Sequence, residues 1–176
     1  MDGNERSIGE SSETKRSSLP RVIWDPTPPV IVKKMLELAQ VRPEDIVYDL
    51  GCGDARILLT AVKEFGAKKA VGYEINKDIY EKTKQEIQKQ RLQDTISIIR
   101  VDLLNADISK ASVITLFLSM EANEYLRPKL EKEAEPGTRI VSYVHTMRKW
   151  QEENIESDSL NRLYLYVVPK TFSHLM

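Results

Sequence analysis

The chain has 176 residues, which fits one domain and argues against two full ones. Hydrophobic side chains make up 41% and charged side chains 30%, so a packed core is expected, and 26 basic against 27 acidic side chains give a formal net charge of -1 that disfavours chain-wide attraction to nucleic acid or anionic lipid. One cysteine excludes an internal disulfide framework and a Cys-built zinc site, and the two histidines lie too far apart to favour a metal centre.

The first twenty residues differ from the rest in composition. They are rich in Ser, Glu, Arg and Lys and almost devoid of apolar side chains, so we expect a disordered tail over residues 1–20 and one domain over residues 21–176. This tail lacks the apolar core of a signal peptide, and no window approaches the ~20 apolar residues that span a bilayer. We therefore expect a soluble, cytoplasmic protein without a membrane partner.

A proline-rich segment opens the domain. Trp24 stands beside prolines at positions 26, 28 and 29, which predicts a stiff, extended backbone. Pro29 is suited to a first helical turn, and the apolar side chains that follow have helical spacing. A first helix is therefore predicted from Pro29 to about residue 40.

Strands and helices then alternate along the chain. Strands are expected at 46–51, 69–75, 95–102, 112–118 and 138–145, and helices at 55–66, 76–92 and 121–137. Asn76 is the expected N-cap of the second of these helices. Several strands are apolar on successive positions, which predicts an α/β fold with a doubly wound, mostly parallel sheet covered on both faces.

The last predicted strand, 162–169, is reached differently. A polar stretch precedes it, with no long crossover helix. This strand is therefore expected to enter antiparallel, as a hairpin at the edge of the sheet.

The turn after the first strand carries the first candidate site. Gly51 and Gly53 let the backbone turn sharply and approach a ligand, although a Gly-x-Gly pattern alone is weak. The dinucleotide fingerprint requires a small residue where this chain has Arg56. Asp49, two residues before the first glycine, suits a ligand that carries an ammonium group better than a pyrophosphate. Asp54 could cap the following helix and Arg56 could lie along the surface, so neither is singled out as a ligand contact.

Two further carboxylates follow the next strands. Glu74 lies about 20 residues past the glycines, where an acidic side chain can accept ribose hydroxyls. Asp102 ends the third predicted strand, placed to meet an adenine amino group. Together with Asp49, these residues match the amino acid, ribose and base of S-adenosylmethionine.

Each of these residues also has a structural interpretation. Asp49 could only cap a turn, Gly51 and Gly53 could only form it, and Glu74 could be a solvated strand end. Asp102 could serve local hydrogen bonding, which is common for Asp after a strand.

At these residues a family resemblance appears. The runs VYDLGCGDAR and VGYEIN resemble motifs I and II of the class I, seven-stranded methyltransferases. The neighbouring segments 24–57 and 112–144, with a Trp six residues beyond, resemble the archaeal non-SET protein lysine methyltransferases. They are more distantly similar to the eukaryotic lysine methyltransferases of the ATP synthase c-subunit. The similarity covers about residues 22–168.

The resemblance implies a Rossmann-like, seven-stranded, mostly parallel sheet with an antiparallel last strand, and a cofactor site for S-adenosylmethionine. It also implies that the Pro-Thr-Pro segment folds over the methionine end of the cofactor, with Thr27 as a contact and Trp24 as a lid. The alternative is that this segment only leads stiffly into the first helix. Ala55 replaces the third glycine of the usual motif. If this position needs a positive φ, Ala costs on the order of 1 kcal/mol, whereas within a helix it is harmless.

No nucleophile or triad is evident, and methyl transfer does not require one, because alignment and a dry channel can suffice. The candidates for an acceptor channel are Phe117, Tyr143 and Trp150, with Leu118, Ser119 and His145 nearby. The alternative for Phe117 and Tyr143 is ordinary core packing, and no residue is assigned as catalytic with certainty.

The sequence therefore favours an enzyme that methylates lysine side chains of proteins, with no metal and no nucleic-acid partner. One alternative is methylation of RNA or a small molecule. Another is a non-catalytic module that only binds the cofactor, which Ala55 mildly favours.

Overall fold

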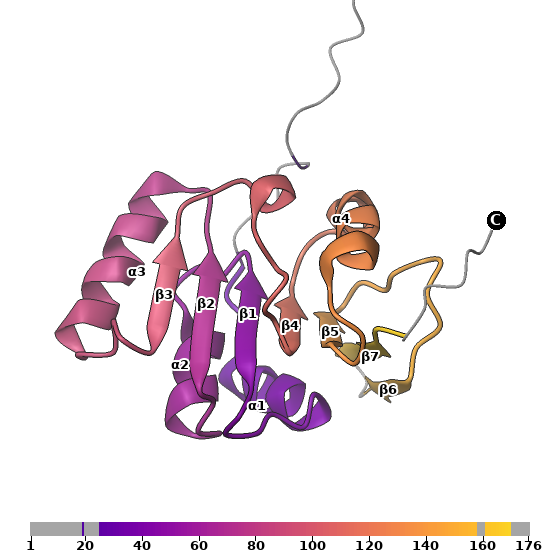
Figure 1. The fold of residues 1–176 in the computed structure, drawn as a ribbon, viewed down its shortest axis with the longest axis horizontal. Coiled ribbons are helices and arrows are strands. Elements are labelled where there is room, and N and C mark those ends of the chain that lie inside the picture. Colours follow the sequence, from indigo (N-terminus) through magenta and orange to yellow (C-terminus); the bar gives the residue numbers. More distant parts are fainter. Residues whose placement is uncertain (1–18, 20–24, 158–160, 170–176) are drawn as a thin grey trace, which may run out of the picture.

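A computed structural model describes residues 19, 25–157 and 161–169 (Figure 1). The strands are β1 (Ile46–Leu50), β2 (Lys69–Tyr73), β3 (Ile96–Ile99), β4 (Val113–Leu116), β5 (Arg139–Tyr143), β6 (Asn154–Ser157) and β7 (Arg162–Val167). The helices are α1 (Pro29–Leu38), α2 (Arg56–Lys63), α3 (Lys77–Lys89), α4 (Met120–Glu133) and a short 3-10 helix, η1 (Leu103–Asn105). The predicted disordered tail lies outside the described residues, apart from Leu19, and the domain boundary at residue 21 stays a prediction.

The seven strands form one sheet in the order β3-β2-β1-β4-β5-β7-β6. β3, β2, β1, β4 and β5 are parallel, and β7 pairs antiparallel with both β5 and β6. This confirms the predicted doubly wound, seven-stranded sheet. In the register, Asp49 of β1 lies opposite Gly72 of β2 and Thr115 of β4. The strand order reverses at β1, so the crevice for a ligand is expected at its carboxyl end.

Helices cover both faces of the sheet. On one face, α1 and α2 bury their apolar sides against β1, β4 and β5, and α3 packs beside α2 over β2 and β3. On the other face, α4 and η1 close a second core over β1, β4, β5 and β7. Apolar side chains of β1 alternate between these cores, Val47 in one and Tyr48 and Leu50 in the other. This alternation fixes the sheet between two layers.

Local signals explain where the helices begin. Pro29 occupies the first turn of α1, as predicted, because its missing N–H needs no partner there. Asn76 caps α3, as predicted, through its side-chain oxygen, which accepts from the amides of Asp78 and Ile79. Ser119 caps α4 by accepting from the amide of Ala122 at 3.1 Å. The end assigned to helix 121–137 was too late, since α4 ends at Glu133.

Three expectations about the sheet were wrong. The last strand, β7, is not at the edge, because β6 pairs with its outer side. β6 lies in the stretch read as polar loop, and all four of its residues are exposed, so it carries no apolar pattern. β3 ends at Ile99 rather than at residue 102. Between β3 and β4 the described chain forms the short helix η1.

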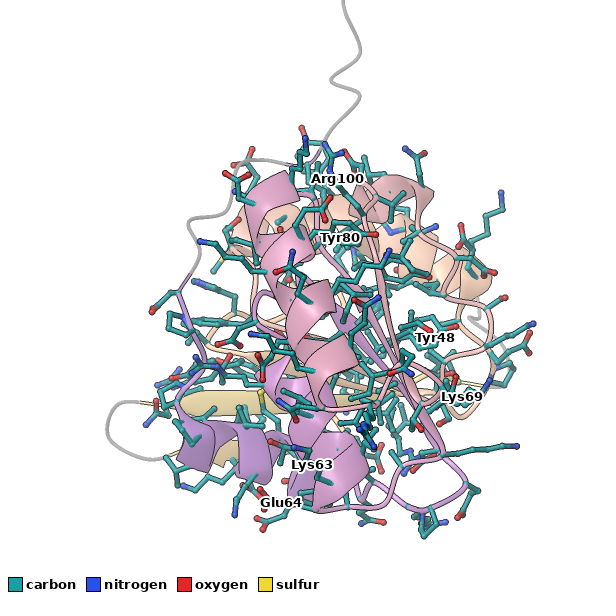
Figure 2. All side chains as sticks on the ribbon, turned by 90° about the vertical axis from the view of Figure 1, so that its left-hand side faces the viewer. Tyr48, Lys63, Glu64, Lys69, Tyr80 and Arg100 are labelled. Carbon is teal, nitrogen blue, oxygen red and sulfur yellow. The ribbon has the colours of Figure 1, made fainter. Side chains whose placement is uncertain are left out.

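Figure 2 views the molecule from the side of α3. Arg100, which follows β3, lies at the upper end, whereas Lys69 at the start of β2 and the pair Lys63 and Glu64 lie at the lower end. The carboxyl ends of the parallel strands therefore share the upper edge. Among the described residues, no helix combines the length and apolar character needed to cross a bilayer.

Candidate functional site

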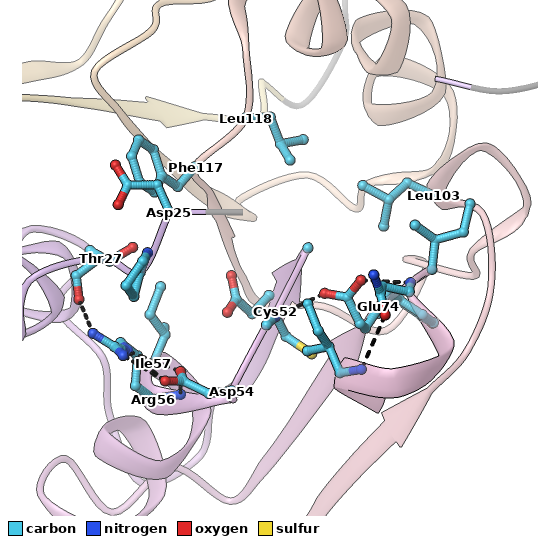
Figure 3. A pocket seen from close by; sticks show the side chains of 18 of the residues that line it. Asp25, Thr27, Cys52, Asp54, Arg56, Ile57, Glu74, Leu103, Phe117 and Leu118 are labelled. Atoms are coloured by element: carbon cyan, nitrogen blue, oxygen red, sulfur yellow. Dashed lines mark hydrogen bonds and ion pairs between the residues drawn. The ribbon is translucent and has the colours of Figure 1, made fainter. Parts of the chain in front are cut away.

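A cavity of about 690 Å³ opens at the carboxyl ends of β1, β2 and β4 (Figure 3). Its volume is within the range of small-molecule sites, ~300 to 1,000 Å³. Glu74 and Leu103 lie at one end in Figure 3, and Thr27 and Arg56 at the other. Of the predicted site residues, Thr27, Asp49, Gly51, Gly53, Glu74, Asp102 and Phe117 line this cavity.

The turn from β1 to α2 forms the floor of the cavity. The amides of Gly51 and Cys52 both donate to the carbonyl of Tyr73 at 3.0 Å, which ties the turn to the end of β2. Gly51 has a φ of 93°, and a Cβ there would lie 3.2 Å from Leu118 Cδ2. A side chain at this position would therefore be strained and would narrow the cavity.

The structure decides whether Ala55 has a positive φ or lies within the helix, which the sequence left open. It has a φ of 62° in the left-handed region and precedes α2 as its N-cap. The position is therefore of the kind that favours glycine, and Ala bears a cost on the order of 1 kcal/mol there.

Asp49 lies at the end of β1 with only 4% of its surface exposed. Its Oδ1 accepts from the Thr115 hydroxyl at 2.8 Å. Burial raises the pKa of Asp49 to about 7, the Thr115 hydrogen bond opposes this rise, and the charges of Asp54 and Glu74 add to it. Because burial disfavours the charged form of this carboxylate and few hydrogen bonds offset that cost, the position suits a ligand with a cationic group, whose charge would stabilise the carboxylate.

Glu74 follows β2 and is also buried. Its Oε2 accepts from the amide of Gly53 at 3.1 Å, and its Oε1 accepts from the amide of Asn76 at 2.8 Å. These bonds fix the carboxylate between the turn after β1 and the start of α3. Each oxygen keeps a further lone pair for ligand hydroxyls.

Asp102 lies on the cavity, but it does not end a strand. It is the N-cap of η1, and its Oδ1 accepts from the amide of Leu104 at 2.9 Å. This is the local hydrogen bonding considered as its alternative role. Within residues 19, 25–157 and 161–169 its other oxygen has no hydrogen bond, so a ligand contact remains open to it.

Within the segment 25–28, residues 25–27 form a wall of the cavity opposite Glu74. Thr27 is 5% exposed, and its carbonyl accepts from Arg56 Nη1 at 2.8 Å. Trp24, the predicted lid residue, lies outside the described residues.

The candidate channel residues separate into two groups. Phe117 and Leu118 line the cavity, and Tyr143 packs behind Phe117 with ring centroids 4.6 Å apart. Tyr143 and Trp150 are not on the cavity lining: the Tyr143 hydroxyl donates to Asn161 Oδ1 at 2.6 Å, and the partly buried Trp150 packs on Tyr166 at the edge of the core. Their roles in an acceptor channel stay predictions that this arrangement does not favour.

Among the charged residues that line the cavity, the sequence assigned no ligand role to Asp25, Asp54 and Arg56. Arg56 forms a forked ion pair with Asp54, with Nε 2.9 Å from Oδ1 and Nη2 2.5 Å from Oδ2, and holds the pKa of Asp54 below its usual value. The sequence feature that set Arg56 apart was its position, where the dinucleotide fingerprint requires a small residue. Asp25 carried no such signal.

The described residues contain no group of three or more His, Cys, Asp or Glu side chains that could hold a metal ion. Burial raises the pKa of the Cys52 thiol well above its usual value, so this thiol next to the cavity stays protonated. The site therefore offers buried carboxylates, backbone amides and apolar walls. These fit a nucleoside with a cationic amino acid part.

Comparisons with known proteins agree with this fit. The family described as the ANTKMT methyltransferase domain matches residues 49–154. A protein-lysine N-methyltransferase of Saccharolobus islandicus is 46% identical over 86% of this chain and 97% of its own length. The adenine nucleotide translocase lysine N-methyltransferase of Mus musculus is 28% identical, and the match covers 78% of this chain but only 59% of the mouse protein.

Among solved structures, an RNA methyltransferase from Salinibacter ruber in complex with S-adenosyl-L-homocysteine is similar with a TM-score of 0.80. It is 37% identical, and the match covers 83% of this chain and 95% of that chain.

Proposed function

The chain belongs to the ANTKMT methyltransferase family, which makes it a class I, S-adenosylmethionine-dependent methyltransferase, and we propose that its acceptors are lysine side chains of proteins. The observation that carries the proposal is the cavity at the tips of β1, β2 and β4, in which Asp49 and Glu74 are buried. The Saccharolobus relative supports lysine as the acceptor, because the match covers nearly its whole length.

We propose that Asp49 binds the ammonium of the cofactor and that Glu74 accepts its ribose hydroxyls. Gly51 and Gly53 let the backbone approach the ligand, and Asp102 meets the adenine amino group. Thr27 contacts the methionine end from the segment 25–28. This assignment is supported by the common cavity that these residues line.

S-adenosylmethionine, when bound, supplies the methyl group on its sulfonium. The acceptor lysine must first lose a proton, which costs about 4.6 kcal/mol at pH 7 for a side chain with a pKa of ~10.4. Phe117 and Leu118 supply apolar surface at the β4 end of the cavity, where desolvation favours the neutral amine. These residues align the amine and exclude water, so the transfer needs no dedicated base.

A second candidate acceptor is RNA. The observation in its favour is the likeness to the Salinibacter protein described as an RNA methyltransferase. The near-neutral charge of this chain gives it less support. A cytoplasmic location and the absence of a membrane partner stay predictions of the sequence.

Incubation of the protein with a cell extract and cofactor labelled on the methyl group tests the proposal. We expect label in protein, lost after protease and recovered as methyl-lysine after acid hydrolysis. The Glu74→Gln variant serves as the matched control and should leave little label. Label that only ribonuclease removes would favour RNA, and cofactor binding without transfer would contradict an enzyme.

A further inference from the structure

Arg56 joins two parts of the cavity wall that are far apart in the sequence. Its guanidinium forks onto Asp54 in the turn after β1, and its Nη1 donates to the carbonyl of Thr27 at 2.8 Å. Both partners line the cavity, and dashed lines mark these contacts in Figure 3. The arginine is thus a bridge between the β1 turn and the segment 25–28.

The segment that it holds is stiff. Positions 26, 28 and 29 are prolines, which fix φ on both sides of Thr27. At its far end the segment continues into α1, where the carbonyl of Pro28 accepts from the amides of Ile31 and Val32. Because α1 is anchored in the core, the bond from Arg56 to Thr27 sets where Asp25 and Pro26 lie along the cavity.

The charge of Arg56 is already compensated. Asp54 accepts from both Nε and Nη2. The positive charge of the guanidinium is therefore balanced by the Asp54 carboxylate, while the remaining nitrogen, Nη1, donates to the carbonyl of Thr27. A lysine has all its donors on one atom and cannot reproduce this planar, two-sided contact.

We propose that Arg56 is a positioning residue, which clamps the segment 25–28 against the β1 turn and thereby slows release of the cofactor. The proposal rests on the proposed function only in assigning this cavity to the cofactor. It says nothing about the acceptor.

The test measures binding of S-adenosylhomocysteine by calorimetry and stopped flow in Arg56→Met and Arg56→Lys. We expect both variants to raise the dissociation constant at least tenfold, mainly through faster release. Lys63→Met is the matched control, because it removes an exposed cation from the same helix outside this cavity. Its binding should match that of the wild type.

Hydrogen exchange of the peptide 25–33, with and without S-adenosylhomocysteine, gives a second readout that a loss of charge alone would not move. Thr27 reports on the segment 25–28, since the prolines around it have no amide hydrogen, and residues 30–33 report on the start of α1. We expect the ligand to slow this exchange in the wild type and in Lys63→Met, but far less in both Arg56 variants.

Asp54→Asn is a second variant in case Arg56→Met fails to fold. It leaves the guanidinium in place but weakens its fork, so we expect about a threefold rise in the dissociation constant. The ligand should again slow the exchange of the peptide 25–33 less than it does in the wild type. Normal binding by Arg56→Lys would overturn the proposal, because charge alone would then suffice. Weaker binding with unchanged exchange would also overturn it, since Arg56 would then act on the ligand directly. Normal binding and exchange with no methyl-lysine product would refute only the proposed function.

Discussion

The loops on the two sides of β4, around β1 and β2 and beyond β5, are held by different contacts. Around β1 and β2, the turn that forms the cavity floor is tied to the adjacent strand, through the Tyr73 carbonyl and through Glu74. Beyond β5, the loop 144–150 is held by the neighbouring strand β7 and, in addition, by α4. The amide of Val144 donates to the Arg162 carbonyl at 2.8 Å, and the amide of Met147 donates to the Tyr166 hydroxyl at 2.9 Å. Asn123 Nδ2 donates to the carbonyl of His145 at 3.1 Å, and Trp150 Nε1 donates to Glu131 Oε1 at 2.9 Å.

The turn after β1 is thus tied to one neighbouring strand, whereas the loop 144–150 is held by a neighbouring strand and by a helix on one face of the sheet. Val144 at the start of this loop has a φ of 69°, which is strained for a β-branched residue. The contacts from β7 and α4 therefore hold a loop whose own backbone does not favour its shape.

The largest effect is expected at Gly72 in β2. A Cβ there would lie 2.5 Å from Cys52 Sγ and 2.6 Å from Leu58 Cδ1. Gly72→Ala should therefore overpack the core under the β1 turn and lower the free energy of unfolding by ~3 kcal/mol, measured by denaturant titration. Gly66→Ala is the control, because it meets no atom within 4 Å and adds only the strain of a positive φ, about 1 kcal/mol. Equal losses in the two variants would contradict the packing argument.

The α4 side can be tested at Asn123. Its side chain is fully buried and donates to Ser142 Oγ and the His145 carbonyl. Asn123→Ala should lower the free energy of unfolding by ~2 kcal/mol, while the affinity for S-adenosylhomocysteine stays within about twofold. Glu121→Ala, exposed on the same helix, should cost less than about 0.5 kcal/mol. A large loss of cofactor affinity in Asn123→Ala would break the distinction between the two sides.

Glu74→Gln tests the β2 side with little change in size. The amide would present a donor to one of the two backbone N–H groups that now bind the carboxylate. We expect cofactor binding to weaken by at least ~1.5 kcal/mol, the scale of a charge-assisted hydrogen bond, as measured by calorimetry. Glu81→Gln on the exposed side of α3 should bind normally. Unchanged affinity in a folded Glu74→Gln variant would mean that the cofactor lies elsewhere.

Asp49 should make cofactor binding depend on pH. The pKa of Asp49 is raised from 3.8 to about 7, so below about pH 7 the folded protein without cofactor keeps this carboxyl protonated. Because ionisation of the buried carboxyl is unfavourable, the stability of the folded protein falls as pH rises from 3.8 to about 7. An ammonium binds the ionised form, so affinity should increase from pH 5.5 to 7, by ~1.4 kcal/mol per pH unit at most. Calorimetry across this range checks the slope, with Asp49→Asn as a variant that should bind weakly and without pH dependence. A flat profile for the wild type would rule out this role of Asp49.

The smallest effect is expected at Ala55. Ala55→Gly relieves a positive φ, worth about 1 kcal/mol, but removes a buried methyl worth about 0.8 kcal/mol. The net change in unfolding free energy should stay under ~0.5 kcal/mol, with unchanged affinity for S-adenosylhomocysteine. Ala61→Gly inside α2 loses the methyl without any relief and should destabilise by more than 1 kcal/mol. A large gain in affinity from Ala55→Gly would mean that the alanine weakens the site.

The sequence by itself predicted the parallel sheet, the start of α1 at Pro29, the N-cap of α3 at Asn76, and three of the carboxylates that line the cavity, Asp49, Glu74 and Asp102. These features rest on local chemistry: apolar runs, capping side chains and glycines that turn the chain after a strand. The sequence did not predict β6, because an exposed edge strand carries no alternation of apolar residues. The channel roles of Tyr143 and Trp150 stay predictions, since the sequence pattern of an aromatic residue is the same whether it faces a ligand or a core.

Only the tertiary structure decided the positions that depend on partners far along the chain. Arg56 reaches Thr27 across 29 residues, and Asn123 holds the loop after β5 across 22 residues. Such contacts form when packing of the layers brings the segments together, so no local sequence pattern predicts them. The positive φ of Ala55 belongs to the same class, because the turn between β1 and α2 imposes it on a residue that has no preference for it.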